Sequence, residues 1–197
     1  MAMFILTTFT FWIAGSILMI TGFGREIFSR HQMRVTPIGL VMLMTSVIAI
    51  ISAIFYPSRS VNVGNIIWET FMSSVFLLRA RPRLWWETFM VAVMLTVVRG
   101  FGPVNPHHAD VVNWALWESV ITGVFMGSII SDPLFSALSA GMAAVQSGII
   151  LTFLAGRMHF GTIRDMAFLL SSTLIAWHMS WIMNWIYTKR HAEMSNS

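Results

Sequence analysis

Apolar residues along this chain fall into seven runs of about 20 residues, separated by short polar segments. A helix of about 20 residues, rising 1.5 Å per residue, crosses the roughly 30 Å hydrocarbon core of a bilayer. The runs cover approximately residues 3 to 22, 37 to 56, 61 to 78, 84 to 101, 111 to 130, 133 to 156 and 166 to 187. The pattern therefore predicts an all-α fold, a polytopic transmembrane helical bundle of about seven spans.

The third and fourth runs are the weakest of the seven. Each has fewer apolar positions than the others and carries a glutamate. The alternative interpretation is that these two runs form a re-entrant or interfacial hairpin, which would leave five spans. The prolines support the proposed boundaries independently of hydropathy, because proline interrupts a helix interior. All six, at positions 37, 57, 82, 103, 106 and 133, fall at or between the run ends.

The basic residues between the runs predict the orientation of the chain. Loops on the cytoplasmic side of membrane proteins are enriched in Lys and Arg. With the N-terminus outside, eight of the 12 Lys and Arg residues lie on the inner side and four on the outer side. We therefore expect an outside N-terminus, a single transmembrane domain over residues 1–188, and a short polar cytoplasmic tail over residues 189–197. The first run has no preceding basic segment, so we interpret it as an uncleaved span.

Composition agrees with a membrane protein and excludes several chemistries. Hydrophobic residues make up 56% of the chain and charged residues only 10%, whereas soluble domains carry roughly a quarter charged residues. The absence of cysteine excludes disulfides, thiolate metal sites and cysteine nucleophiles. The net charge of +4 comes from short basic groups between apolar runs, so we expect no nucleic-acid partner. The expected location is a plasma membrane, by default the inner membrane of a bacterium.

The fifth and sixth runs are separated only by Ser131, Asp132 and Pro133, which predicts an antiparallel hairpin. Small residues recur every four positions on both sides, a pattern that lets helix backbones approach closely in lipid. They are Ser119, Gly123, Gly127 and Ser131 in the fifth run, and Ser136, Ala140, Ala144 and Gly148 in the sixth. We expect these rows to pack the hairpin. The alternative is that part of this face binds a second copy or another membrane protein.

Three glutamates lie within the runs, and an ionisable side chain in a membrane span requires a partner or a wet cavity. The segment from Trp68 to Met72 recurs as Trp86 to Met90, with Glu69 and Glu87 at matching positions. Glu87 lies one helical turn after Arg83 near the inner face, so we expect an interfacial ion pair there.

Alternation of the spans places a group of polar residues in the outer half of the membrane. The group consists of Glu69, Arg99, His107, His108, Asp110 and Glu118. One interpretation is a structural ion pair of Arg99 with either glutamate. Another is a polar site for a small solute, a lipid headgroup or a proton, with Glu118 as the acceptor. A metal site is disfavoured, because the two adjacent histidines lack the i, i+4 spacing of a helical ligand pair.

No catalytic motif is present, and with one deeply placed histidine a bis-histidine haem site is excluded, so we expect no cofactor. Our leading hypothesis is a non-enzymatic accessory, sensory or scaffolding component whose intramembrane charges are paired. Its expected partners are membrane lipids and another membrane protein or a second copy. The alternatives are a small-solute or proton-coupled transporter that uses the outer polar group, and a membrane enzyme that acts on a lipid headgroup.

Overall fold

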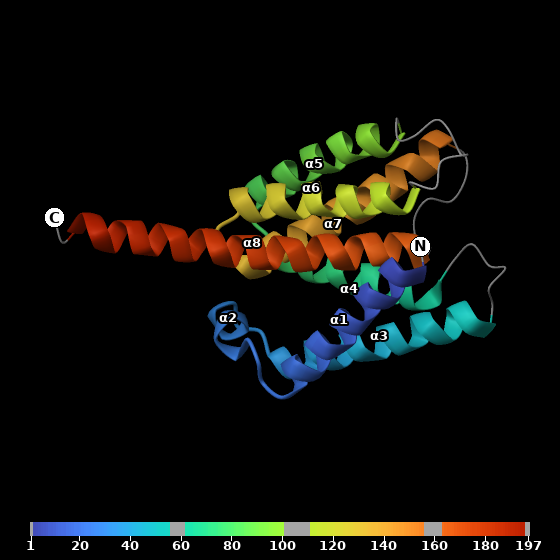
Figure 1. Ribbon diagram of the computed structural model, residues 1–197, viewed down its shortest axis with the longest axis horizontal. Coiled ribbons are helices and arrows are strands. Elements are labelled where there is room, and N and C mark those ends of the chain that lie inside the picture. The colour runs from blue at the N-terminus through green and yellow to red at the C-terminus, as the bar shows by residue number, and fades with distance from the viewer. Residues whose placement is uncertain (1, 56–61, 101–110, 156–162, 196–197) are drawn as a thin grey trace.

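The computed structural model describes residues 2–55, 62–100, 111–155 and 163–195, and every regular element in these ranges is a helix (Figure 1). The eight helices are α1 (Ala2–Ile20), α2 (Arg25–Arg30), α3 (Val35–Phe55), α4 (Val63–Arg79), α5 (Pro82–Gly100), α6 (Val111–Ile129), α7 (Pro133–Ala155) and α8 (Ile163–Ser195). The prediction of an all-α chain is confirmed over the described residues.

Seven of the helices coincide with the seven predicted runs, and their ends have local causes. Asn62 caps the start of α4 by accepting a hydrogen bond from the backbone N–H of Asn65 at 3.2 Å. Pro82 and Pro133 occupy the first positions of α5 and α7, where the missing N–H has no intrahelical partner to lose. Hydropathy did not indicate α2, a helix of six residues. It also ended the last helix too early, because α8 continues through the polar tail to Ser195.

Three helices of the described chain are long and apolar enough to cross a membrane: Val35–Phe55, Pro133–Ala155 and Met166–Lys189. Two further apolar segments, Leu6–Ile20 and Leu116–Ile129, are shorter. Large apolar side chains are exposed over the bundle, among them Leu78, Phe153 and Leu154. An exterior of this kind matches a hydrocarbon solvent. The structure thus indicates a membrane protein, while α4 and α5 do not qualify as spans by the same criterion of length and hydropathy.

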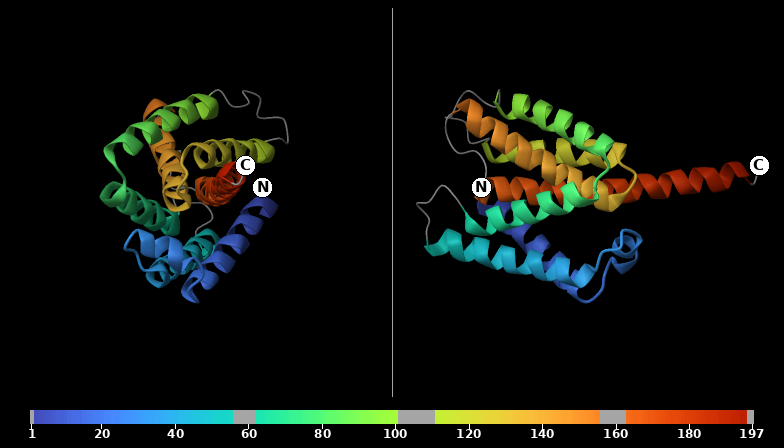
Figure 2. Two further views of the ribbon diagram at one scale, coloured as in Figure 1. Left: turned by 90° about the vertical axis from the view of Figure 1, so that its left-hand side faces the viewer. Right: turned by 180° about the vertical axis from the view of Figure 1, so that it is seen from behind.

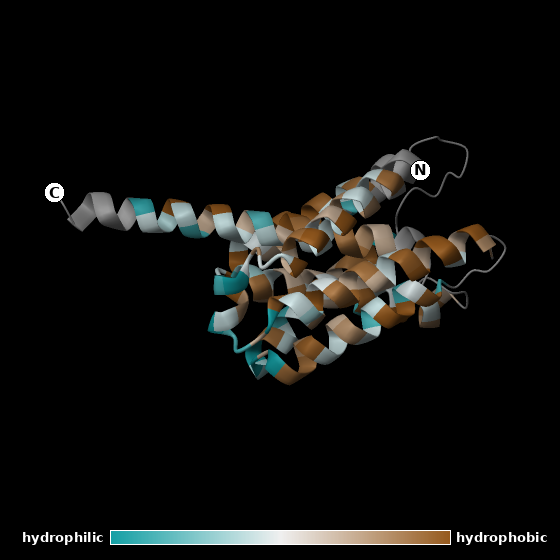
Figure 3. Cartoon of the chain, turned by 90° about the horizontal axis from the view of Figure 1, so that it is seen from below, coloured by the Kyte–Doolittle hydropathy of each residue, from teal (hydrophilic) through white to brown (hydrophobic). Residues whose placement is uncertain are grey.

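Helix α7 lies in the middle of the bundle and packs against α4, α5, α6 and α8 (Figure 2). Its buried face consists largely of Ala, Ser and Gly, which allows close approach of several neighbours. Helix α3 packs on α1 and α4, away from α5 and α6. Hydrophilic residues gather around α2 and along the outer part of α8, while the helices between are largely hydrophobic (Figure 3).

The small-residue row of α6 packs against α8, and this corrects our expectation that it packs the α6–α7 hairpin. A Cβ atom built on Gly123 would lie 2.6 Å from Cβ of Ile175, and one on Gly127 would lie 2.5 Å from Cβ of Met179. Both pairs are 52 positions apart, as parallel helices in a constant register require. Helices α6 and α7 are still neighbours in the bundle, but the glycines of α6 do not face Ala140 and Ala144.

The row on α7 is buried, with Ala140, Ala144 and Gly148 all shielded from solvent. Its first member, Ser136, donates a hydrogen bond to the backbone carbonyl of Ala176 in α8 at 3.1 Å. Small residues of both α6 and α7 therefore pack closely against α8. The short loop makes α6 and α7 neighbours in space, but it does not determine which of their faces are in contact.

Candidate functional site

Arg99 and Glu118 form an ion pair between the end of α5 and the first half of α6. The distance from Nε of Arg99 to Oε2 of Glu118 is 3.8 Å, which is an ion-pair separation rather than a hydrogen bond. The side chains are only 12% and 6% exposed. Arg99 lies in the last turn of α5 and Glu118 in the first half of α6, so the structure brings together two residues that the sequence singled out.

A third helix contributes to this pair. The guanidinium carbon of Arg99 lies 4.9 Å from the ring centroid of Phe168 in α8, a cation–π distance. The aromatic face therefore shares the stabilisation of the positive charge with the carboxylate. Because an isolated buried charge costs several kcal/mol, loss of either partner of a buried pair costs about 3 to 5 kcal/mol. The arrangement can join α5, α6 and α8 at one point.

Glu69 has a described partner of a different kind. Nδ2 of Asn65 donates a hydrogen bond of 2.8 Å to Oε1 of Glu69 one turn later in α4, and both residues are buried. Asn62, which caps this helix, also donates through Nδ2 to the backbone carbonyl of Ala49 in α3 at 2.9 Å. Asn62, Asn65 and Glu69 thus form a polar edge along α4 and connect it to α3. The spacing of the two asparagines before Glu69 was the signal that sequence reasoning missed.

The remaining members of the predicted outer group, His107, His108 and Asp110, lie outside the described residues. Within the ranges that the structure describes, no three His, Asp or Glu side chains come close enough to hold a metal ion. At the opposite end, Nε of Arg83 lies 2.7 Å from Oε1 of Glu87, with side chains 90% and 38% exposed. That pairing confirms the ion pair predicted from their spacing.

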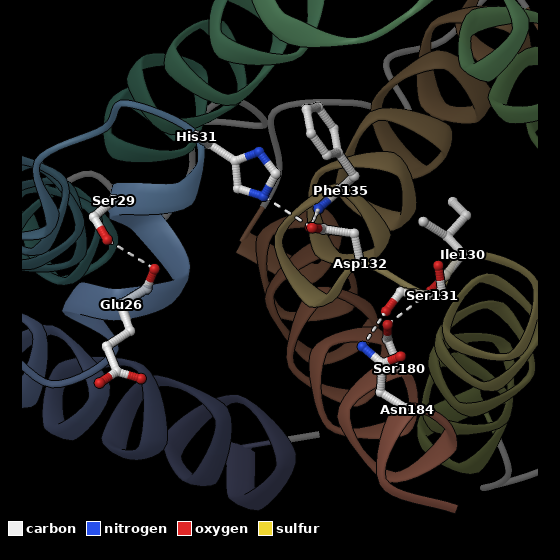
Figure 4. Close-up of polar contacts among 9 residues, drawn as sticks. All are labelled: Glu26, Ser29, His31, Ile130, Ser131, Asp132, Phe135, Ser180 and Asn184. Atoms are coloured by element: carbon white, nitrogen blue, oxygen red, sulfur yellow. Dashed lines mark hydrogen bonds and ion pairs between the residues drawn. The ribbon is translucent and has the colours of Figure 1, made fainter. Parts of the chain in front are cut away.

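A second polar contact joins α2 to the α6–α7 turn, which are far apart in the sequence (Figure 4). Nε2 of His31 lies 2.8 Å from Oδ2 of Asp132. The other carboxylate oxygen of Asp132 accepts a hydrogen bond from the backbone N–H of Phe135 at 3.0 Å and so caps α7. The ring of Phe135 in turn meets the His31 ring edge to face, with centroids 4.9 Å apart. This contact positions α2 against the bundle, and sequence reasoning gave no role to either polar residue.

Beside this contact lies a polar cavity of about 840 Å³, which we call the basic cavity. Its charged lining comes from the end of α2, from the end of α4 and the start of α5 with the turn between them, and from the α6–α7 turn. These charged or ionisable residues are Arg30, His31, Arg79, Arg81, Arg83, Glu87 and Asp132. Four guanidinium groups against two carboxylates give the hollow an excess of positive charge.

A second cavity, of about 650 Å³, lies among α1, α3, α4, α7 and α8, next to α2. We call it the apolar cavity, because its lining is almost entirely hydrocarbon, thioether and aromatic. Trp12 and Trp68 meet edge to face in its wall with centroids 5.4 Å apart. Neither of the two cavities is lined by Glu69, Arg99 or Glu118.

Over the described residues, the chain is thus an all-helical bundle with three helices able to cross a membrane, a buried charge pair, a basic cavity and an apolar cavity. Comparisons with protein-family models, with curated proteins and with solved structures found no match for the chain.

Proposed function

We propose that this chain is a seven-span integral protein of the plasma membrane, with its N-terminus outside, and that it acts as a non-enzymatic accessory or scaffolding component. The arrangement of the arginines supports this orientation. Arg30, Arg79, Arg81 and Arg83 line one cavity at one end of the bundle, as residues on a common cytoplasmic face would. The three long apolar helices and the two shorter apolar segments support five of these spans. Helices α4 and α5, which pack against α7, would be the other two.

The observation that carries the functional part of the proposal is the Arg99–Glu118 pair. A carrier that used these groups for a solute or a proton would expose them to a cavity. Instead the two charges compensate one another between three helices, with side chains only 12% and 6% exposed. The pair therefore fits a role in assembly of the bundle, which favours the scaffold over the transporter.

The C-terminal part of α8 supplies a surface for a partner. It projects beyond the other helices (Figure 1). Trp181, Trp185 and Tyr187 are 57%, 59% and 64% exposed on it. Aromatic side chains are enriched at protein interfaces and at the membrane interface, where they combine an apolar body with a polar edge. A partner membrane protein that covers this segment would bury these side chains.

The charge pair can be tested with single and double substitutions. Glu118→Gln should lower the stability of the purified protein by about 3 kcal/mol or more, because Arg99 would be left as a buried charge. Arg99→Gln combined with Glu118→Gln should recover part of this loss. Glu87→Gln is the matched control, because an exposed i, i+4 pair contributes only about 0.3 to 0.5 kcal/mol. The proposal is refuted if Glu118→Gln unfolds at the wild-type temperature while abolishing uptake of a solute into proteoliposomes.

The scaffold function itself requires a partner. Purification from native membranes, followed by mass spectrometry, should recover one membrane protein in a fixed ratio with the wild-type chain. Trp181→Ala combined with Trp185→Ala should lose this protein. Phe153→Ala combined with Leu154→Ala, two exposed residues on α7, is the matched control and should retain it. Equal recovery with both double variants would show that α8 is not the docking surface.

A further inference from the structure

The basic cavity and the apolar cavity are adjacent, because three elements contribute to both. In α4, Val75 lines the apolar cavity and Arg79, one turn later, lines the basic cavity. In α7, the consecutive residues Leu134 and Phe135 line the apolar and the basic cavity respectively. Helix α2 places Phe28 in the apolar lining and Arg30 in the basic lining. One helical turn rises only about 5.4 Å, so the two cavities are neighbours along these elements.

Among the residues that the structure describes, some guanidinium groups of the basic cavity have no carboxylate partner. Of the charges in its lining, Arg83 is paired with Glu87, and Asp132 contacts His31. In the part of the chain that the structure describes, Arg30, Arg79 and Arg81 have no carboxylate within 4 Å. Planar guanidinium groups bind phosphate oxygens through paired hydrogen bonds. Three such groups around one hollow suit a phosphate ester.

The apolar cavity suits a hydrocarbon chain. Its volume of about 650 Å³ lies within the usual range of roughly 300 to 1,000 Å³ for small-molecule sites. Five methionines contribute to the lining: Met19, Met33, Met42, Met72 and Met179. The unbranched thioether side chain adapts to irregular apolar shapes, which favours a flexible ligand. Gly15 adds open space, because a Cβ atom built there would meet nothing within 4 Å.

We propose that the two cavities together form a binding site for one anionic phospholipid. The phosphate group lies among Arg30, Arg79 and Arg81, and an acyl chain extends into the apolar cavity past Phe28. Charge complementarity selects the anionic headgroup, and the continuous apolar lining selects the chain. Basic pockets between membrane helices recognise anionic headgroups by the same chemistry. This site is independent of the proposed scaffold function, since none of its residues belongs to the Arg99–Glu118 pair or to the exposed part of α8.

Binding can be measured by native mass spectrometry of the full chain in detergent, titrated with phosphatidylglycerol, phosphatidylcholine or inorganic phosphate. The wild-type chain should retain phosphatidylglycerol at least tenfold more tightly than phosphatidylcholine and should bind inorganic phosphate weakly. Arg79→Gln combined with Arg81→Gln should weaken phosphatidylglycerol binding by about tenfold or more. Arg25→Gln combined with Arg34→Gln is the matched control, because Arg25 begins α2 and Arg34 follows it, but neither lines the basic cavity.

The apolar half is tested separately. Gly15→Leu places a side chain into open space and should weaken phosphatidylglycerol binding several-fold without changing the affinity for inorganic phosphate. Leu78→Phe is its control, since Leu78 is 82% exposed and lines neither cavity. Arg30→Gln repeats the headgroup test from a short helix at the edge of the bundle, should the α4–α5 double variant fail to fold.

Three results would overturn the proposal. Equal retention of phosphatidylglycerol and phosphatidylcholine would show that the negative charge of the headgroup does not contribute to binding. An equal loss of binding in the Arg25 and Arg34 control would reduce the effect to general attraction by a basic surface. Tight binding of inorganic phosphate, together with no effect of Gly15→Leu, would identify a site for a soluble phosphate compound instead of a lipid. Failure of the partner purification described above would leave all three readouts unchanged.

Discussion

Replacement of Gly127 by alanine tests the parallel packing of α6 on α8 directly. The added Cβ would lie 2.5 Å from Cβ of Met179, 2.7 Å from the backbone oxygen of Ala176 and 3.0 Å from the backbone nitrogen of Ser180. Carbon atoms in van der Waals contact are separated by about 3.5 to 4.0 Å. The two helices would therefore have to move apart by about 1 Å or more at this point.

The cost follows from what the movement disturbs. Ser180 donates a hydrogen bond of 2.7 Å to the backbone carbonyl of Ile130, and Asn184 donates one of 2.8 Å to that of Ser131, so both satisfy carbonyls at the end of α6. Overpacking costs about 1 to 3 kcal/mol, and contact with backbone atoms places Gly127 near the upper end. The higher helix propensity of alanine returns about 1 kcal/mol. We therefore expect a net loss of about 2 kcal/mol in the free energy of unfolding.

Unfolding in detergent, followed by tryptophan fluorescence against temperature or denaturant, measures this loss. Gly15→Ala is the matched control, because Gly15 also lies inside a helix but a Cβ there meets nothing within 4 Å. Its expected effect is neutral or a gain of up to about 1 kcal/mol. Gly123→Ala should resemble Gly127→Ala, since its Cβ would approach Ile175 in the same register. If Gly127→Ala is as stable as Gly15→Ala, the close α6–α8 contact is wrong.

Three further changes test local features by the same unfolding measurement. Gln32 has a φ of 56° at the end of α2, where glycine is preferred, so Gln32→Gly should stabilise the protein by up to about 1 kcal/mol, and a loss would refute the strain. Asp132→Ala removes both the cap on Phe135 and the contact with His31, and should cost about 1 to 2 kcal/mol, whereas no change would exclude a structural role. Thr88 is fully buried, and its hydroxyl has no hydrogen-bond partner among the described residues, so the isosteric Thr88→Val should be neutral or slightly stabilising. A clear destabilisation by Thr88→Val would show that the hydroxyl has a partner.

The helix boundaries were predictable because hydrocarbon length and proline position act locally along the chain. The predicted run at 37 to 56 and helix Val35–Phe55 differ by two residues at most at either end. The exceptions have physical reasons. Helix α2 is too short to produce a hydropathy signal, and the polar extension of α8 has no apolar periodicity that would mark it. A polar helix that leaves the bundle cannot be told from a polar tail by hydropathy alone.

The partner of the α6 glycine row was not predictable from loop length. A short turn requires α6 and α7 to be neighbours, but each helix has several faces, and the turn does not select among them. The sequence did contain the complementary row: Ser172, Ala176 and Ser180 recur every four residues in α8. The small-residue rows of α6 and α8 pack together, and Ser180 donates a hydrogen bond to the carboxyl end of α6. These contacts specify the α6–α8 pairing more strongly than the connection between α6 and α7 does.

The candidate site was predictable where charge alone determined it. Arg99 and Glu118 are costly in a membrane unless they are paired, so one interpretation of the sequence was an ion pair of Arg99 with either Glu69 or Glu118. The structure pairs Arg99 with Glu118. The contact between His31 and Asp132 has no such requirement, because both side chains are partly exposed, at 20% and 36%, and could be solvated separately. Only the folded position of α2 brings them together. Sequence reasoning therefore identifies charged groups that must be neutralised on burial. It misses contacts between partly exposed groups that only the fold brings together.

Because of the position of the apolar cavity, lipid binding should also affect the stability of the protein. The cavity lies where α1 and α3 meet α4, α7 and α8, and hydrogen bonds and ring contacts cross that boundary. Thr8 and Ser171 share a hydrogen bond of 3.1 Å, and Phe28 stacks on Trp177 with centroids 5.8 Å apart. A chain held in the cavity would add apolar contact to both sides, so binding would stabilise the folded state by mass action. Phosphatidylglycerol should therefore raise the unfolding temperature of the wild-type chain more than that of Gly15→Leu, and an equal rise in both would show that the lipid acts elsewhere on the protein.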